Sequence, residues 1–349
     1  MHCSGTSRPL IRIVHLLFLS GFATLGACSA PGAVLRAEVL AAPARASLRA
    51  LAPLDARVCW VSGSGSTVLR TEDGGRTWRA VGPRGGDVLD LRSLVAFDDR
   101  RAVVASAGQP ARILRTGDGG VTWETVHEEP DPAAFFDSMA RDGDRIVLYG
   151  DPVGGALYVL ASEDGGANWR RESVGVAARE GEAGFAASNG LVQFGPGGTT
   201  WIATGGAPGS RLLARDASGS WAATDLPLAR GEASRGAFAI ATDGRGRMVA
   251  VGGDHANPSA ADGTAAWSDD GGRTWQPANA HGYRSSVAWL ESASCWLAAG
   301  PQGCCSSTDG GRTWLPCELP GFHVVAVAPD GSVWAAGSDG RIARIRAMQ

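Results

Sequence analysis

The sequence predicts an all-β fold: a single β-propeller of seven four-stranded antiparallel blades. A motif of the form S/T-x-D-x-G-x-T-W recurs along the chain at intervals of about 40–55 residues, a length that suits one four-stranded blade. The 349 residues include 50 Gly, 18 Pro and 12 Trp, a composition typical of short strands joined by tight turns. A ring of blades would also hide the exposed edges of so many short strands.

Five copies of the motif are well preserved, and each contains an Asp, a pair of Gly and a closing Trp. The Asp carboxylate can accept N–H groups within a turn, and the Gly pair permits backbone angles closed to other residues. The Trp begins the next strand and supplies a large buried surface. We therefore expect these boxes to fasten the fold and not to act on a substrate. Their residues are Asp73 with Trp78, Asp118 with Trp123, Asp164 with Trp169, Asp270 with Trp275, and Asp309 with Trp314.

The two ends of the chain are expected to close the ring together. A degenerate sixth box spans 216–221, and a seventh unit ends at 341–346, where a box should begin. The outer strand missing from that unit is best supplied by residues 34–40. The chain therefore divides into a signal peptide (1–27), a tether (28–33) and the propeller (34–349).

The first segment is predicted to be an export signal. Arg8 and Arg12 flank the start of an apolar stretch that is too short to span a bilayer, and the run 25–28 resembles a bacterial lipobox ending in Cys28. We expect Cys28 to carry a lipid that holds the protein on the periplasmic side of a bacterial membrane, its only membrane attachment. Cleavage after Ala30 by an ordinary signal peptidase is the alternative.

Composition narrows the partners and cofactors. All 32 basic residues are Arg, the acidic residues number 35, and no basic run occurs, which argues against nucleic acid as a partner. The scattered His residues and the lack of a C-x-x-C pair predict no metal site. In an oxidising compartment one disulfide is favoured, between Cys304 and Cys317, which should face each other across a hairpin. We expect a monomer without a cofactor.

The boxes, the leader and the chain length resemble the bacterial relatives of the photosystem II stability and assembly factors, within the BNR/Asp-box propellers. The resemblance covers roughly residues 34–349 and implies the fold. Segments at 135–137, 150–153, 181–189 and 251–254 resemble a subgroup often labelled oxidoreductase. No dinucleotide-binding motif supports that activity here.

A second, fainter repeat predicts a ligand site. Arg residues occur near the start of four inner strands, His323 takes that place in the seventh blade, and acids lie nearby in the third and fourth. Inner strands line the channel of a propeller, so these side chains should meet at one mouth. Converging guanidinium groups repel one another unless an anion neutralises them. We therefore expect an anionic protein segment or a small anionic ligand there; the resemblance likewise implies an arginine patch. The candidate residues are Arg49, Arg92, Arg235, Arg284, Tyr283, His323, Asp137 and Glu182.

Two other functions compete with binding. A sialidase-like, carbohydrate-active hydrolase could use Asp137, Glu182 or Asp254 as general acid and base. Sialidases also carry Asp-boxes, but the F/Y-R-I-P segment expected before the first box is replaced by residues 68–71, and only three Tyr are present. The last alternative is a purely structural repeat protein. We expect binding, with no catalytic residue.

Overall fold

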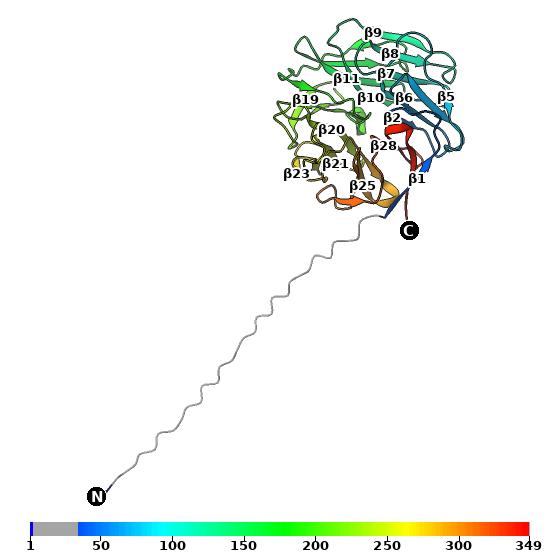
Figure 1. Cartoon of the computed structure of the whole chain (residues 1–349). Helices are drawn as coiled ribbons and strands as arrows, with labels where there is room; N and C mark the ends of the chain where they lie inside the picture. The colour runs from blue at the N-terminus through cyan, green and yellow to red at the C-terminus, as the bar shows by residue number, and fades with distance from the viewer. Residues whose placement is uncertain (3–33, 349) are drawn as a thin grey trace. The chain divides into compact units, whose positions relative to one another are not determined.

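The computed structural model describes residues 1–2 and 34–348, and the latter form seven antiparallel sheets around one axis (Figure 1). The seven-bladed all-β fold is thus confirmed. The signal peptide, the tether and Cys28 lie outside the described residues. Among the helices of the described part, none is long and apolar enough to cross a membrane.

Each blade has four main strands that follow one another from the channel outwards. Blade one contains β2 (Leu48–Pro53), β3 (Cys59–Gly63), β4 (Thr67–Thr71) and β5 (Arg79–Ala80). Blade two contains β6 (Leu91–Ala96), β7 (Ala102–Ser106), β8 (Ala111–Thr116) and β9 (Glu124–Glu129). Blade three contains β10 (Phe136–Asp142), β11 (Arg145–Val153), β12 (Ala156–Ser162) and β13 (Arg170–Arg171).

Blades four to six follow the same plan. Blade four contains β15 (Val192–Phe194), β16 (Thr200–Ala203), β18 (Arg211–Arg215) and β19 (Trp221–Asp225). Blade five contains β20 (Arg235–Thr242), β21 (Met248–Asp254), β22 (Ala265–Ser268) and β23 (Gln276–Ala278), and the short strands β14 (Glu182–Ala183) and β17 (Gly205–Gly206) extend its inner edge. Blade six contains β24 (Ser286–Leu290), β25 (Cys295–Gly300), β26 (Gly303–Ser307) and β27 (Leu315–Cys317).

Blade seven joins the two ends of the propeller. It contains β28 (Val324–Val327), β29 (Val333–Ala336), β30 (Ile342–Ala347) and, outermost, β1 (Leu35–Leu40). Strand β1 pairs antiparallel with β30 from Leu35 opposite Ala347 to Leu40 opposite Ile342. Leu35 is buried in the apolar cluster between blades six and seven. The predicted closure is confirmed: β1 supplies the fourth strand of blade seven and covers the edge of β30.

The boxes form the turns between the third and fourth strands of their blades. In the second box, Asp118 accepts hydrogen bonds from the backbone N–H of Thr122 (2.9 Å) and from its hydroxyl (2.6 Å). The Thr116 hydroxyl donates to the same carboxylate (2.9 Å) and accepts from the N–H of Gly120. Hydrogen bonding, chiefly from Thr122, lowers the pKa of Asp118 to about 2. The carboxylate therefore acts as a turn brace.

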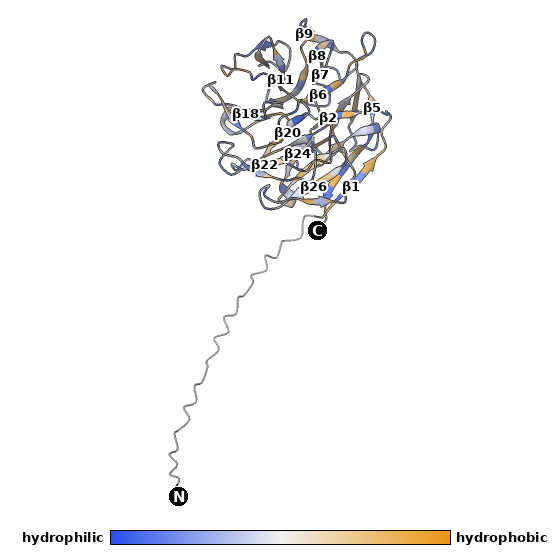
Figure 2. Cartoon of the chain, turned by 60° about the vertical axis from the view of Figure 1, so that its left-hand side comes forward, coloured by the Kyte–Doolittle hydropathy of each residue, from blue (hydrophilic) through white to orange (hydrophobic). Residues whose placement is uncertain are grey.

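The core lies between neighbouring blades. Trp60, Trp296 and Trp334, each on a second strand, are fully buried. The strands carry both apolar and polar residues (Figure 2). One face of a strand packs against the next blade, whereas the outer strands and the loops are exposed to water. This packing fixes the inner strands around the channel.

Candidate binding site at the channel mouth

A β-bulge recurs at the start of the inner strands. In four blades the pairing between the first and second strands skips one residue: Arg49, Arg92, Asp137 or Phe238. A bulge inserts one unpaired residue and re-aims its side chain. The same local pattern occurs in the last two blades, where Ser285 and Ser286 both face Ala299, and His323 and Val324 both face Ala336.

The bulges correct the predicted arginine column. The residue equivalent to Arg49 is Phe238 in blade five and Ser285 in blade six, and not Arg235 or Arg284. The spacing from the next Gly could not reveal this, because the register depends on where each bulge falls. Of the four arginines that were predicted to line the mouth, only Arg49 and Arg92 occupy equivalent positions.

Arg284 and Arg235 have partners of their own. Arg284 is buried and donates to the Cys305 Sγ (3.3 Å) and to the carbonyl oxygens of Tyr283 and His281 (3.0 Å each), so it points between blades five and six. Arg235 pairs with Asp254 (2.9 Å). The mouth therefore holds two arginines at equivalent positions, and not four.

Arg49 and Arg92 come from adjacent blades and influence each other. Burial lowers the pKa of Arg49, and the positive charge of Arg92 lowers it further. Arg92 forms an ion pair with Asp90 (2.7 Å), and Arg49 donates to the hydroxyl of Ser47 (3.1 Å). Their remaining contacts are long ones, at 3.4 Å, to the carbonyl oxygens of Ala187 and Ala186. Two cations thus face one carboxylate and three neutral acceptors.

Tyr283 and His323 lie beside this pair. Burial raises the pKa of the Tyr283 hydroxyl, although the charges of Arg49 and Arg92 act in the opposite direction. His323 is buried, with Nδ1 3.1 Å from the carbonyl oxygen of Leu48, and burial together with the charge of Arg49 lowers its pKa to about 4. His323 is therefore neutral at pH 7 and adds no positive charge.

Residues 184–190, here called the plug, cross the channel beneath the arginines. This segment belongs to the long connection between blades three and four, and it is held by blades on several sides. Besides the two arginine contacts, hydrogen bonds to blades two, three, five and six hold the plug. Written from donor to acceptor, they are Gly184 N to Asp151 Oδ1 (2.7 Å), Ser188 Oγ to Ser285 O (2.6 Å), Asn189 Nδ2 to Leu94 O (2.7 Å), Met139 N to Asn189 Oδ1 (3.0 Å) and Ile240 N to Gly190 O (2.9 Å).

The three candidate acids do not form a catalytic pair. Asp137 is fully buried next to the plug. Glu182 is buried in an ion pair with Arg211 (2.5 Å), and Asp254 is neutralised by Arg235. Within residues 34–348, none of the three lines the central cavity, so the geometry does not favour the hydrolase alternative.

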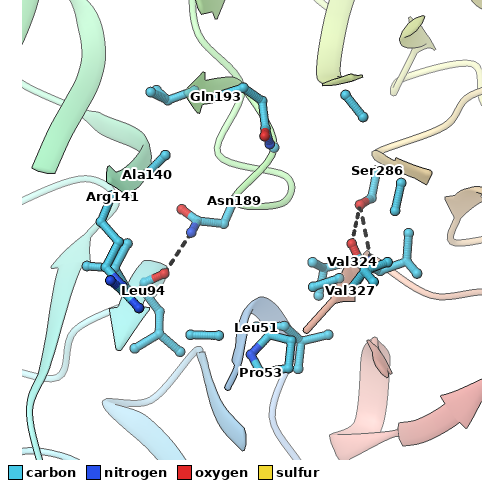
Figure 3. Close-up of a pocket in the computed structure, with 18 of the residues that line it drawn as sticks. Leu51, Pro53, Leu94, Ala140, Arg141, Asn189, Gln193, Ser286, Val324 and Val327 are labelled. Carbon is cyan, nitrogen blue, oxygen red and sulfur yellow. Dashed lines mark hydrogen bonds between the residues drawn. The ribbon is translucent and has the colours of Figure 1, made fainter. Parts of the chain in front are cut away.

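The cavity itself lies on the other side of the plug. It has a volume of about 480 Å³ and is lined by residues of all seven inner strands, with Asn189 and Gly190 at its floor. Leu51, Leu94 and Val324 contribute to an aliphatic wall, and Gln193 lies on the wall opposite Pro53 (Figure 3). The two ends of the channel thus differ: one is blocked by the plug, and the other is hollow, with aliphatic side chains beside polar ones such as Arg141 and Gln193.

Comparison with known proteins agrees with this architecture. Residues 36–179, less than half of the chain, match the family model described as photosynthesis system II assembly factor YCF48. A solved structure titled "YCF48 bound to D1 peptide" is similar at 17% identity, with a TM-score of 0.62 over 89% of this chain and 96% of that one. YCF48 from Cyanidioschyzon merolae matches at 18% identity, with a TM-score of 0.62 over 88% and 98% of the two chains.

The chain is a BNR-type β-propeller that resembles the photosystem II assembly factors. A streptogramin B lyase structure is also similar, at 13% identity and a TM-score of 0.61 over 90% of this chain and 98% of that one. Structural likeness at such low identity reaches an enzyme as readily as an assembly factor, so it establishes the fold alone. No curated protein sequence matches the chain significantly.

The cysteines of this assembly-factor-like propeller are free thiols in the described residues. Cys304 and Cys317 are opposite each other on β26 and β27, as the hairpin predicts. The predicted disulfide between them is not formed in the structure. The two Sγ atoms instead point to different carbonyl oxygens, that of Pro320 at 3.4 Å and that of Leu315 at 3.9 Å. Within residues 34–348, no group of three or more acid, His or Cys side chains is placed to hold a metal ion.

Few sequence features mark the plug. The segment contains no box, and its strongest feature is the run of small residues from Gly181 to Gly190 in a long connection. A long irregular connection in a regular repeat is where a functional insertion is expected. That length and the resemblance of residues 181–189 to a known subgroup were the available clues.

Proposed function

We propose that this propeller assists assembly by holding an anionic segment of another protein, or a small anionic ligand, at the mouth formed by Arg49 and Arg92. The observation that carries the proposal is the pair of equivalent bulges, which aim guanidinium groups from adjacent blades at one place. Their pairing with Asp90 alone leaves a net positive charge in a partly buried setting.

The chemistry of the pair favours a carboxylate or a phosphate. Each guanidinium group donates one of its N–H groups to a neutral carbonyl oxygen of the plug over a long distance of 3.4 Å. An anion would replace these contacts by shorter, charge-assisted and potentially bidentate hydrogen bonds. The YCF48 structure determined with a D1 peptide supports a peptide as the partner class.

The place of action in this proposal is the periplasmic side of a bacterial membrane, with the lipid on Cys28 as anchor. Its support is the leader sequence. Fractionation of cells that express the full chain tests it: wild type should be found with membranes, and Cys28→Ser should be released into the soluble periplasmic fraction. A soluble wild-type protein would exclude the anchor.

Binding is tested with immobilised peptides of matched length in which Glu is exchanged for Gln. The chain 34–349 should prefer the Glu peptides, and the preference should weaken as salt is raised. The double variant Arg49→Ala/Arg92→Ala should lose at least about tenfold in affinity, the effect of removing one charged contact worth about 1.4 kcal/mol. Arg84→Ala removes an exposed arginine and serves as the control.

Equal binding of Glu and Gln peptides by wild type, or unchanged affinity of the double variant, would contradict the arginine mouth. Either result would favour the alternative that the protein is a purely structural repeat protein. Hydrolysis of an acidic glycoside by wild type, lost in Asp137→Asn, would instead revive the hydrolase.

A further inference from the structure

The plug rests on a buried carboxyl group that is poorly satisfied. Asp137 is 0% exposed, and neither of its carboxyl oxygens has a hydrogen bond of normal geometry within the described residues, although the backbone N–H of Ala186 and the carboxyl group of Asp151 lie close enough to act on it. A buried polar group without a partner is costly, and an ionised one is much more so. The bulge that places Arg49 and Arg92 at the mouth places Asp137 in the equivalent position of blade three.

The contact between Asp137 and the plug is close. A Cβ added to Gly184 would lie 2.2 Å from the Asp137 Oδ2, so only glycine fits at this point of the plug. The N–H of Gly184 donates to Asp151 Oδ1 (2.7 Å). One residue of the plug is therefore held between two carboxyl groups from neighbouring strands of blade three.

The charges around Asp137 favour its neutral form. Burial raises the pKa of Asp137 well above its ordinary value, and the negative charge of Asp151 raises it further, while Arg92 opposes both. Burial also raises the pKa of Asp151. Tyr149 on β11 is buried nearby with an unpartnered hydroxyl. Glu182 on β14 faces the same region but is neutralised by Arg211.

We propose that Asp137 is the proton-controlled latch of the plug: its neutral carboxyl group keeps residues 184–190 seated across the channel, and its ionisation accompanies plug opening. Opening lets water reach Asp137, which then releases its proton to solvent. The same movement withdraws the carbonyl oxygens of Ala186 and Ala187 from Arg92 and Arg49. The latch would thus connect the charged mouth with the cavity on the other side of the plug.

The sign of the pH effect follows from the proton balance. In the open state Asp137 ionises near the ordinary value of about 3.9, and in the closed state only at higher pH. At a pH between the pKa of Asp137 in the open state and its pKa in the closed state, each opening releases one proton. The opening equilibrium constant therefore rises about tenfold for each pH unit, and it levels off above the pKa of the closed state.

Hydrogen exchange of the ligand-free chain 34–349, followed by mass spectrometry between pH 5 and 8, measures this opening. Three amides that the plug holds should report it: Gly184, Met139 and Ile240. After correction for the intrinsic pH dependence of exchange, their protection should fall with rising pH in wild type. In Asp137→Asn, protection should depend much less on pH than in wild type, because only Asp151 is left to titrate against the plug.

Two further variants keep the experiment decisive. Asp151→Asn retains an oxygen acceptor for Gly184 but removes the neighbouring charge, so protection should level off at a lower pH than in wild type. Asp339→Asn makes the same charge change at an exposed site and should behave as wild type. Protection that is independent of pH in wild type, or equally pH-dependent in Asp137→Asn, would overturn the latch. Because no ligand is present, this result is separate from the test of anion binding.

Discussion

The outer turns of the ring and the channel at its centre follow different plans. Five boxes repeat one hydrogen-bond network around an Asp, whereas the bulge positions at the mouth carry Arg, Asp, Phe, Ser or His according to the blade. Repetition outside gives a regular frame, and variation inside gives chemistry that no single blade could supply. Stability should therefore respond to changes in the frame, and ligand or pH behaviour to changes in the channel.

The strongest test of the frame is removal of its closing strand. A chain that begins at residue 41 lacks β1, which leaves β30 with an unpaired edge and removes Leu35 from its cluster. We expect a melting temperature lowered by more than about 10 °C, and aggregation through the open edge. The comparison is with the chain that begins at residue 34, measured by thermal unfolding. Equal midpoints would show that closure contributes little.

A single box should have a smaller effect. Asp270→Ala removes the acceptor of the Thr274 N–H and hydroxyl bonds (2.9 and 2.7 Å) at the turn that leads to Trp275. We expect a melting temperature lowered by about 1–3 °C, with peptide binding intact. The matched change in the degenerate box, Asp216→Ala, should cost less, because its carboxylate braces a shorter turn through Ser218 and Ser220. A larger loss in Asp216→Ala would break the comparison.

Low pH should weaken all five boxes at once, because it protonates their Asp carboxylates. Hydrogen bonds from the box Thr residues lower the pKa of Asp73, Asp118 and Asp270 to about 2. Groups with a lowered pKa stabilise the fold above the ordinary pKa of about 4, and that stability is lost as the pH falls towards 2. Thermal midpoints should therefore decline over this window, and Asp270→Ala should decline less than wild type.

A stability change of opposite sign is expected in the channel. Because the folded protein holds the proton of Asp137 more tightly than the unfolded chain does, wild-type stability falls as pH rises above about 4, by up to about 1.4 kcal/mol per pH unit. Asp137→Asn removes this dependence. Its melting temperature should approach that of wild type near pH 4.5 and exceed it at pH 8. A variant that melts below wild type by the same margin at both values would show that Asp137 does not titrate.

The difference between frame and channel also explains what sequence could predict. The boxes are local motifs whose turn geometry is contained in a few consecutive residues, so the blade count and the ring closure followed from them. The mouth depends on register. The bulge of blade five falls at Phe238 and not at Arg235, and no motif marks it.

Contacts between residues far apart in the sequence were harder to predict than the pairing register of the strands. Asp137 and Gly184 are far apart in the sequence, and their contact depends on the path of an irregular connection. Arg284 is a similar case: its turn towards Cys305 is decided by packing between blades five and six. Arg49, Arg92 and His323 do follow the repeat, because each occupies the bulge position of its inner strand.

The pairing of β1 with β30 also sets the order in which the molecule can fold. Strand β1 is made first among the propeller strands and must wait for β30, which is made last. Until then β1 has no partner and blade seven is incomplete. Contacts between residues so distant in sequence form slowly, and an unpaired strand is prone to aggregation in the meantime. Completion of the chain, more than the number of its repeats, should therefore be the event that commits this protein to its native state.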